Sequence, residues 1–152
     1  MVDASMGLFT IGVFQDVAWA EKGLHALKAQ GFPADVISVI AKDTAEAAAL
    51  ADRVFGGPAP TLEIRGVGGV RARGPLVAAL QGADQDLVKH GIAASARRVG
   101  FQPHDGRIFE TLTSRGGVLV AVTTDARAAD ALAILHSYGG GNAAIGAWTG
   151  RV

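Results

Sequence analysis

The stretch GLFTIGVFQDVAWAEKGLHALKAQGFPADVISVIAK (residues 7–42) decides the fold, because it contains one complete strand–helix–strand unit. Its first segment, 7–14, is a short apolar run rich in β-forming residues, which predicts a strand. Asp16 can cap the helix that follows, about 17–30, by accepting hydrogen bonds from backbone N–H groups. A glycine and a proline end that helix, and the apolar run 35–42 predicts a second strand.

The C-terminal part of the chain repeats this plan. GVLVAVT (117–123) predicts a strand, and Asp125 then stands where Asp16 stands in the first unit. A helix is expected over about 126–138, followed by a GGGN break and a weaker final strand, 143–149. When the two units are superposed, their apolar and acidic positions match in phase with both the strand and the helix period.

Two such units that share one sheet predict an α+β, ferredoxin-like fold in a single domain, 1–152. Its sheet would have four antiparallel strands from the halves 7–43 and 117–150, backed by two helices. Residues 44–116 would form a helical and glycine-rich insertion that packs on a face or an edge of the sheet. Within the insertion we expect a short extended piece, TLEI (61–64), and helices over 45–55, from Pro75, from Asp84 or Asp86, and from Pro103 to about Arg115.

The composition excludes several classes of function. The chain has 152 residues, 49% of them hydrophobic, which suits one compact domain. Lys and Arg together number 14, and Asp and Glu also number 14. The net charge is therefore zero and does not favour binding to nucleic acid. The absence of cysteine excludes disulfides and thiolate metal sites. The sequence shows no signal-peptide pattern and no run of 18 apolar residues, so we predict a cytoplasmic protein without a membrane span.

The order of these segments resembles the bacterial heat-induced general stress protein family, a largely uncharacterised domain family. Residues 11–43 look like the opening strand–helix–strand of that family, and 74–83 (GPLVAALQGA) and 100–122 look like its later segments. These motifs are structural. The resemblance therefore implies a stress-associated cytoplasmic protein, with no established reaction, cofactor or catalytic residue to carry over. Arg65 and Gly69 stand where the family has prolines, so this chain has gained charge there.

The stretch IRGVGGVRARGPL (64–76) is the clearest candidate for a binding site. It has no Gly-Lys-Ser/Thr of a Walker loop, and Arg71 occupies the third glycine position of a dinucleotide fingerprint. The N–H groups after Pro75, together with nearby arginines, could still bind an anion. We predict a structural corner here. The alternative is an anion, nucleotide or cofactor site formed by Arg65, Gly66, Gly68, Gly69, Arg71 and Arg73.

Other chemical motifs are incomplete, so we predict no catalytic residue, metal site, cofactor or nucleic-acid partner. RGGVLVAV (115–122) starts like an RNA-binding RNP1 octamer, but Gly117 and Leu119 occupy positions where stacking needs aromatic rings. His104 lies beside Asp105, yet no serine sits in a G-x-S-x-G elbow. No two histidines have the local spacing that is typical of metal ligands. A metal site would therefore have to join histidines that are distant in sequence: His25, His90, His104 and His136.

Two tryptophans are candidate interface residues. Trp19 lies off the apolar face of its helix, and Trp148 lies on the last strand. An exposed tryptophan is a good anchor for a protein interface, although both could instead cover a sheet edge or the insertion. The leading prediction is a non-enzymatic, stress-associated structural or protein-interaction domain that forms a homo-oligomer, most simply a dimer across a sheet face or edge. A small-molecule binder using residues 65–73 is the second hypothesis, and an enzyme with an unrecognised site is the third.

Overall fold

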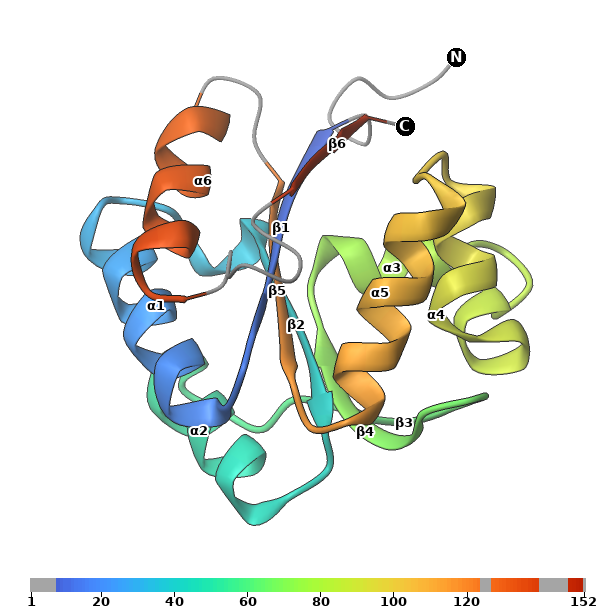
Figure 1. The fold of residues 1–152 in the computed structure, drawn as a ribbon. Coiled ribbons are helices and arrows are strands. Elements are labelled where there is room, and N and C mark those ends of the chain that lie inside the picture. Colours follow the sequence, from blue (N-terminus) through green and yellow to red (C-terminus); the bar gives the residue numbers. More distant parts are fainter. Residues whose placement is uncertain (1–7, 124–126, 140–147, 152) are drawn as a thin grey trace.

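A computed structural model describes residues 8–123, 127–139 and 148–151 of the chain. The strands form one antiparallel sheet in the order β3-β4-β2-β5-β1-β6, with helices on both faces (Figure 1). The strands are β1 Leu8–Phe14, β2 Ile37–Lys42, β3 Thr61–Ile64, β4 Gly68–Arg73, β5 Val118–Thr123 and β6 Trp148–Arg151. The helices are α1 Val17–Ala29, α2 Ala45–Phe55, α3 Pro75–Gln81, α4 Asp86–Arg98, α5 Pro103–Ser114 and α6 Ala128–Ser137.

The first strand–helix–strand unit is confirmed. Asp16 caps α1, because its Oδ1 accepts a hydrogen bond from the Trp19 N–H at 3.0 Å. The predicted apolar face of α1 is fully buried: Ala20, Leu24 and Leu27. Strand β2 begins at Ile37, after a short 3-10 turn, and β1 and β2 both run antiparallel to β5, which lies between them.

The second unit is present with shifted boundaries. Strand β5 agrees with the sequence prediction, and α6 buries Ala131 and Leu135 against the sheet, whereas Leu132 is only half-buried. The last strand that the structure describes is Trp148–Arg151, which pairs with β1 and shares its first two residues with the predicted strand 143–149. Asp125 and residues 140–147 lie outside the described part of the chain.

Among the described residues the sheet has six strands, not the four predicted, because the insertion adds the β3–β4 hairpin at the β2 edge. Glycine is rare in strands, so the two glycines in the β4 sequence GGVRAR weaken the pattern that would predict a strand there. Its alternation is still regular, since Val70 and Ala72 are buried while Arg71 and Arg73 project from the opposite face. The stretch predicted as a corner is therefore a hairpin turn followed by a paired strand.

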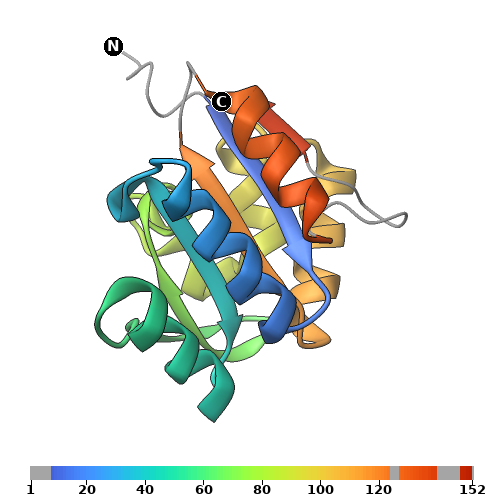
Figure 2. The same ribbon diagram turned by 90° about the vertical axis from the view of Figure 1, so that its left-hand side faces the viewer.

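The helices of the insertion are divided between the two faces of the sheet: α2 lies with α1 and α6 on one face, and α3, α4 and α5 cover the other. Figure 1 shows α3, α4 and α5 together on that side, and Figure 2 shows the other helices across the near face. Phe9 of β1 belongs to the core beneath α3, α4 and α5. In this core the Phe101 ring packs against the rings of Phe9 and Phe109, and each pair of ring centroids is 6.2 Å apart. The sheet is thus closed on both faces, so neither bases nor a partner sheet can stack on it. External contacts must use the helical layers or the sheet edges.

Candidate functional site

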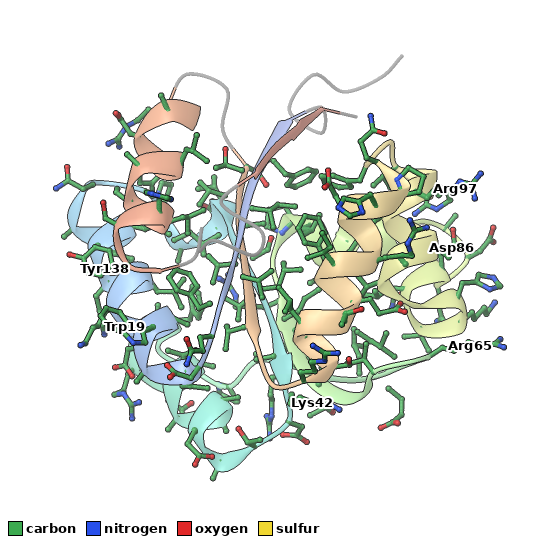
Figure 3. All side chains as sticks on the ribbon, in the orientation of Figure 1. Trp19, Lys42, Arg65, Asp86, Arg97 and Tyr138 are labelled. Atoms are coloured by element: carbon green, nitrogen blue, oxygen red, sulfur yellow. The ribbon has the colours of Figure 1, made fainter. Side chains whose placement is uncertain are left out.

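The structure does not gather the predicted anion-site arginines around one centre. Arg65 lies in the exposed hairpin turn and points outward (Figure 3). Arg71 pairs with Asp43, its Nε 2.8 Å from the Asp43 Oδ1, and its guanidinium also donates to the carbonyl oxygen of Ala59 at 3.1 Å. These contacts tie β4 to the segments that flank α2, so Arg71 already has a structural role.

Arg73 is also used within the fold. Its guanidinium donates two hydrogen bonds of 3.0 Å, to the carbonyl oxygens of Ala34 and Ile37, and lies 3.9 Å from the centre of the Phe55 ring. Burial lowers the pKa of Arg73 from its ordinary value, and the nearby charge of Asp35 acts in the opposite direction. The side chain thus joins β4 to the start of β2 and to the end of α2.

Carboxylates lie next to two of the predicted anion-site glycines. A Cβ built on Gly66 would be 3.5 Å from a carboxylate oxygen of Glu110, and one on Gly69 would be 3.1 Å from Glu63. Negative charge at both positions opposes the binding of a further anion by these backbone segments. A Cβ on Gly68 would instead approach the Lys42 ammonium group, at 3.7 Å.

Replacing Arg73 with alanine is expected to lower the free energy of unfolding by about 2 kcal/mol, because two partly buried carbonyls lose a charged donor and Phe55 loses its stacked cation. Urea unfolding followed by circular dichroism measures the loss. The matched variant Arg65→Ala removes an exposed side chain and should change stability by less than about 0.5 kcal/mol. Equal losses, or stabilisation by phosphate in the wild type but not in Arg73→Ala, would contradict a structural role.

The most exposed large apolar side chain lies elsewhere, on α1. Trp19 is 45% exposed, and no other large hydrophobic side chain among the described residues is as open to solvent. The Lys22 Nζ lies 4.5 Å from the centre of its indole ring. Because Asp16 holds the Trp19 N–H, the ring projects from a fixed first turn of the helix. The predicted exposure of Trp19 is confirmed.

A groove between α1 and α6 begins at this tryptophan. Figure 3 places Trp19 and Tyr138 on the same outer side of the molecule. One hollow, of about 410 Å³, is lined by Gln15, Trp19, His136, Ser137, Tyr138 and Gly139. A second, of about 590 Å³, shares Ser137 and Tyr138 with the first and continues along Ala26, Gln30, Asp130, Ala133 and Ile134. The two hollows are therefore neighbours along α1 and α6, and we call them together the α1–α6 groove.

Contacts on the other side of α1 hold this helix in place. Arg53 of α2 donates two hydrogen bonds to the Glu21 carboxylate, at 2.8 and 2.6 Å, and the Lys28 Nζ donates to the carbonyl oxygen of Val54. The Arg53 bonds, with a smaller effect from His25, lower the pKa of Glu21. The resulting stabilisation is present at pH values above the ordinary carboxyl pKa, and it disappears as the pH falls through the lowered pKa of Glu21. Because the pair is exposed to solvent, this stabilisation is small.

Gly23 lets α1 approach the sheet closely. A Cβ at this position would lie 2.6 Å from the ring of Phe14, which is fully buried beneath the helix. The glycine therefore sets the depth at which α1 sits, and with it the position of the groove wall formed by Trp19 and Ala26. The wall of the groove that α1 forms is thus held by the packing of this helix on the sheet.

The remaining predicted residues are scattered or already bonded. Ser95 and Ser114 each donate to a carbonyl of their own helix, so neither hydroxyl is directed at the His104–Asp105 pair. In the described ranges 8–123, 127–139 and 148–151, no group of three or more metal-ligating side chains converges. Trp148 lies in β6, but its side chain falls outside the described part.

Comparison of the chain with protein-family models, with curated proteins and with solved structures gives no match. None of the helices within the described ranges combines the length and the apolar character that crossing a membrane would require.

Proposed function

We propose that this protein is a non-enzymatic, stress-associated cytoplasmic domain that acts by binding protein through the α1–α6 groove. The observation that carries the proposal is the exposed indole of Trp19, which lines one of the two neighbouring hollows. Tryptophan is enriched among the residues that dominate binding energy, since it buries a large area at a low cost in side-chain entropy.

The composition of the groove supports a protein ligand. Its walls combine the aromatic rings of Trp19 and Tyr138 with small side chains such as Ala26 and Ala133, and polar groups lie between and around them. Protein interfaces have this anatomy, with an apolar centre and a polar rim. Because both helices are anchored in the core, docking onto them requires little reordering.

The architecture supports the rest of the proposal. We infer that β2, β5, β1 and β6 form a ferredoxin-like core, to which the insertion adds the β3–β4 hairpin and a second helical layer. The resemblance to the heat-induced general stress protein family, carried by residues 11–43, 74–83 and 100–122, supports the assignment to that family and to stress. With both sheet faces covered, the helical layers are the main surfaces left for a partner.

Site-specific photo-crosslinking in cells that produce the protein tests the proposal. We expect p-benzoylphenylalanine in place of Ala133, which lines the groove, to give a discrete protein adduct during heat stress. The adduct should disappear in a Trp19→Ala background. The same crosslinker in place of Ala94, an exposed alanine on α4, is the matched control. An identical adduct from both positions, or one that survives Trp19→Ala, would show that the groove is not the binding surface.

A further inference from the structure

We propose that the partner in the α1–α6 groove is a second copy of this chain, docked about a twofold axis. Trp19 of each copy enters the partner's hollow beside Ala26 and Ala133, and Lys22 of each copy meets Asp130 of the other. This inference rests on the proposed function and names the partner of the same surface.

The first argument is the arrangement of a projection and a hollow on one face. Trp19 projects at one end of the groove, and the larger hollow, of about 590 Å³, opens beside Ala26. Seven residues of helix separate the two positions, which is about two turns or roughly 10 Å. A surface that carries a projection and a hollow side by side is complementary to itself, because a twofold rotation places each projection over the other copy's hollow.

The second argument is charge. The Lys22 ammonium group lies 4.5 Å from the centre of the Trp19 ring, so the projection carries a positive charge. Asp130 lines the hollow, and its side chain is 61% exposed although Arg127 approaches it at 3.2 Å. Its carboxylate can therefore accept a second cation. Docking in the proposed register brings Lys22 to Asp130 twice, whereas placing one projection against the other would bring two lysines together.

The β3 edge offers a weaker surface for a second copy. The strand has only four residues, and the N–H of the residue that follows it, Arg65, already donates to the carbonyl oxygen of Val88 on α4. Pairing of backbones along this edge would therefore be short. The groove extends along α1 and α6, whose 13 and 10 residues give lengths of about 20 and 15 Å. We expect an interface at the small end of specific dimers, roughly 600–800 Å² per copy.

Sedimentation equilibrium of the purified full chain tests the self-docking, with Lys22→Glu, Asp130→Lys and the double variant as a charge-reversal cycle. Each single variant should weaken dimerisation at least about 10-fold, and the double variant should restore it to within about 3-fold of the wild type. Trp19→Ala should weaken it by about 30-fold or more. Lys89→Glu, an exposed charge reversal on α4, should leave it unchanged. Circular dichroism confirms that each variant is folded.

A wild type that remains monomeric up to about 100 μM, or a double variant no better than the single ones, would overturn the inference. If the chain is monomeric while the crosslink from position 133 still depends on Trp19, self-docking fails and the groove binds a different protein. If the chain is monomeric and that crosslink is absent as well, the proposed function fails with it.

Discussion

Replacing Gly74 with alanine is expected to lower the free energy of unfolding by at least about 3 kcal/mol. Gly74 has φ +106°, and a Cβ there would lie 2.5 Å from the Ile37 carbonyl oxygen and from the Ser38 Cα. These atoms belong to the backbone of β2, which cannot move away without disturbing its pairing with β4 and β5. The same close approach lets the Ser38 Oγ accept a hydrogen bond from the Leu76 N–H, at 2.8 Å, and so begin α3.

Gly56→Ala separates the steric effect from the conformational one. Gly56 also has a positive φ, +77°, but nothing lies within 4 Å of a Cβ at that position. Its replacement should cost only about 1 kcal/mol, the ordinary penalty for a left-handed alanine. Urea unfolding of the two variants gives the comparison. Similar losses would mean that the β2 backbone can yield, contrary to the packing described for α3.

Gly91→Ala is expected to have the second largest effect, a loss of about 3 kcal/mol in unfolding free energy. Gly91 has φ +93° and divides α4 into two helical pieces. A Cβ would lie 2.7 Å from the Glu110 Oε1 and 2.8 Å from the Arg65 carbonyl oxygen. Because the Glu110 Oε1 also accepts a hydrogen bond from the Ala93 N–H, at 3.1 Å, the substitution disturbs the contact among the hairpin turn, α4 and α5.

Thermal unfolding monitored by circular dichroism compares this variant with Gly116→Ala. Gly116 has φ +101°, and no atom lies within 4 Å of a Cβ there, so its replacement should cost about 1 kcal/mol. A midpoint for Gly91→Ala as high as that of Gly116→Ala would show that the Glu110 contact does not hold the insertion together.

The two strand–helix–strand units could be predicted because their signals are local. Asp16 lies at the helix start, the buried positions of α1 follow one helical face, and the apolar runs of β1 and β5 match their strands. Strand β4 could not be predicted in the same way, because its glycines have low strand propensity and only Val70 and Ala72 show the inward alternation. Its place in the sheet depends on pairing with β2, which is distant in sequence.

The same distinction applies to the candidate sites. The helical phase of α1 predicts an exposed Trp19, but the hollow that Trp19 lines together with Tyr138 depends on how α1 and α6 pack. The glycines and arginines of 64–76 left an anion site open as the alternative to a structural corner, and the structure instead places Arg71 and Arg73 on one face of β4. Their partners come from other segments, and local sequence does not reveal them: Asp43, Ala59, Ala34, Ile37 and Phe55.

The most direct test of the account is whether protein contact buries Trp19. The chain has two tryptophans, so in a Trp148→Phe background the fluorescence reports Trp19 alone. Acrylamide quenching is measured as the protein concentration rises. We predict that quenching weakens and that the emission shifts to shorter wavelength over the range in which dimers form, and that Lys22→Glu moves both changes to higher concentration. Emission and quenching that stay constant while the protein associates would contradict the α1–α6 groove as the interface.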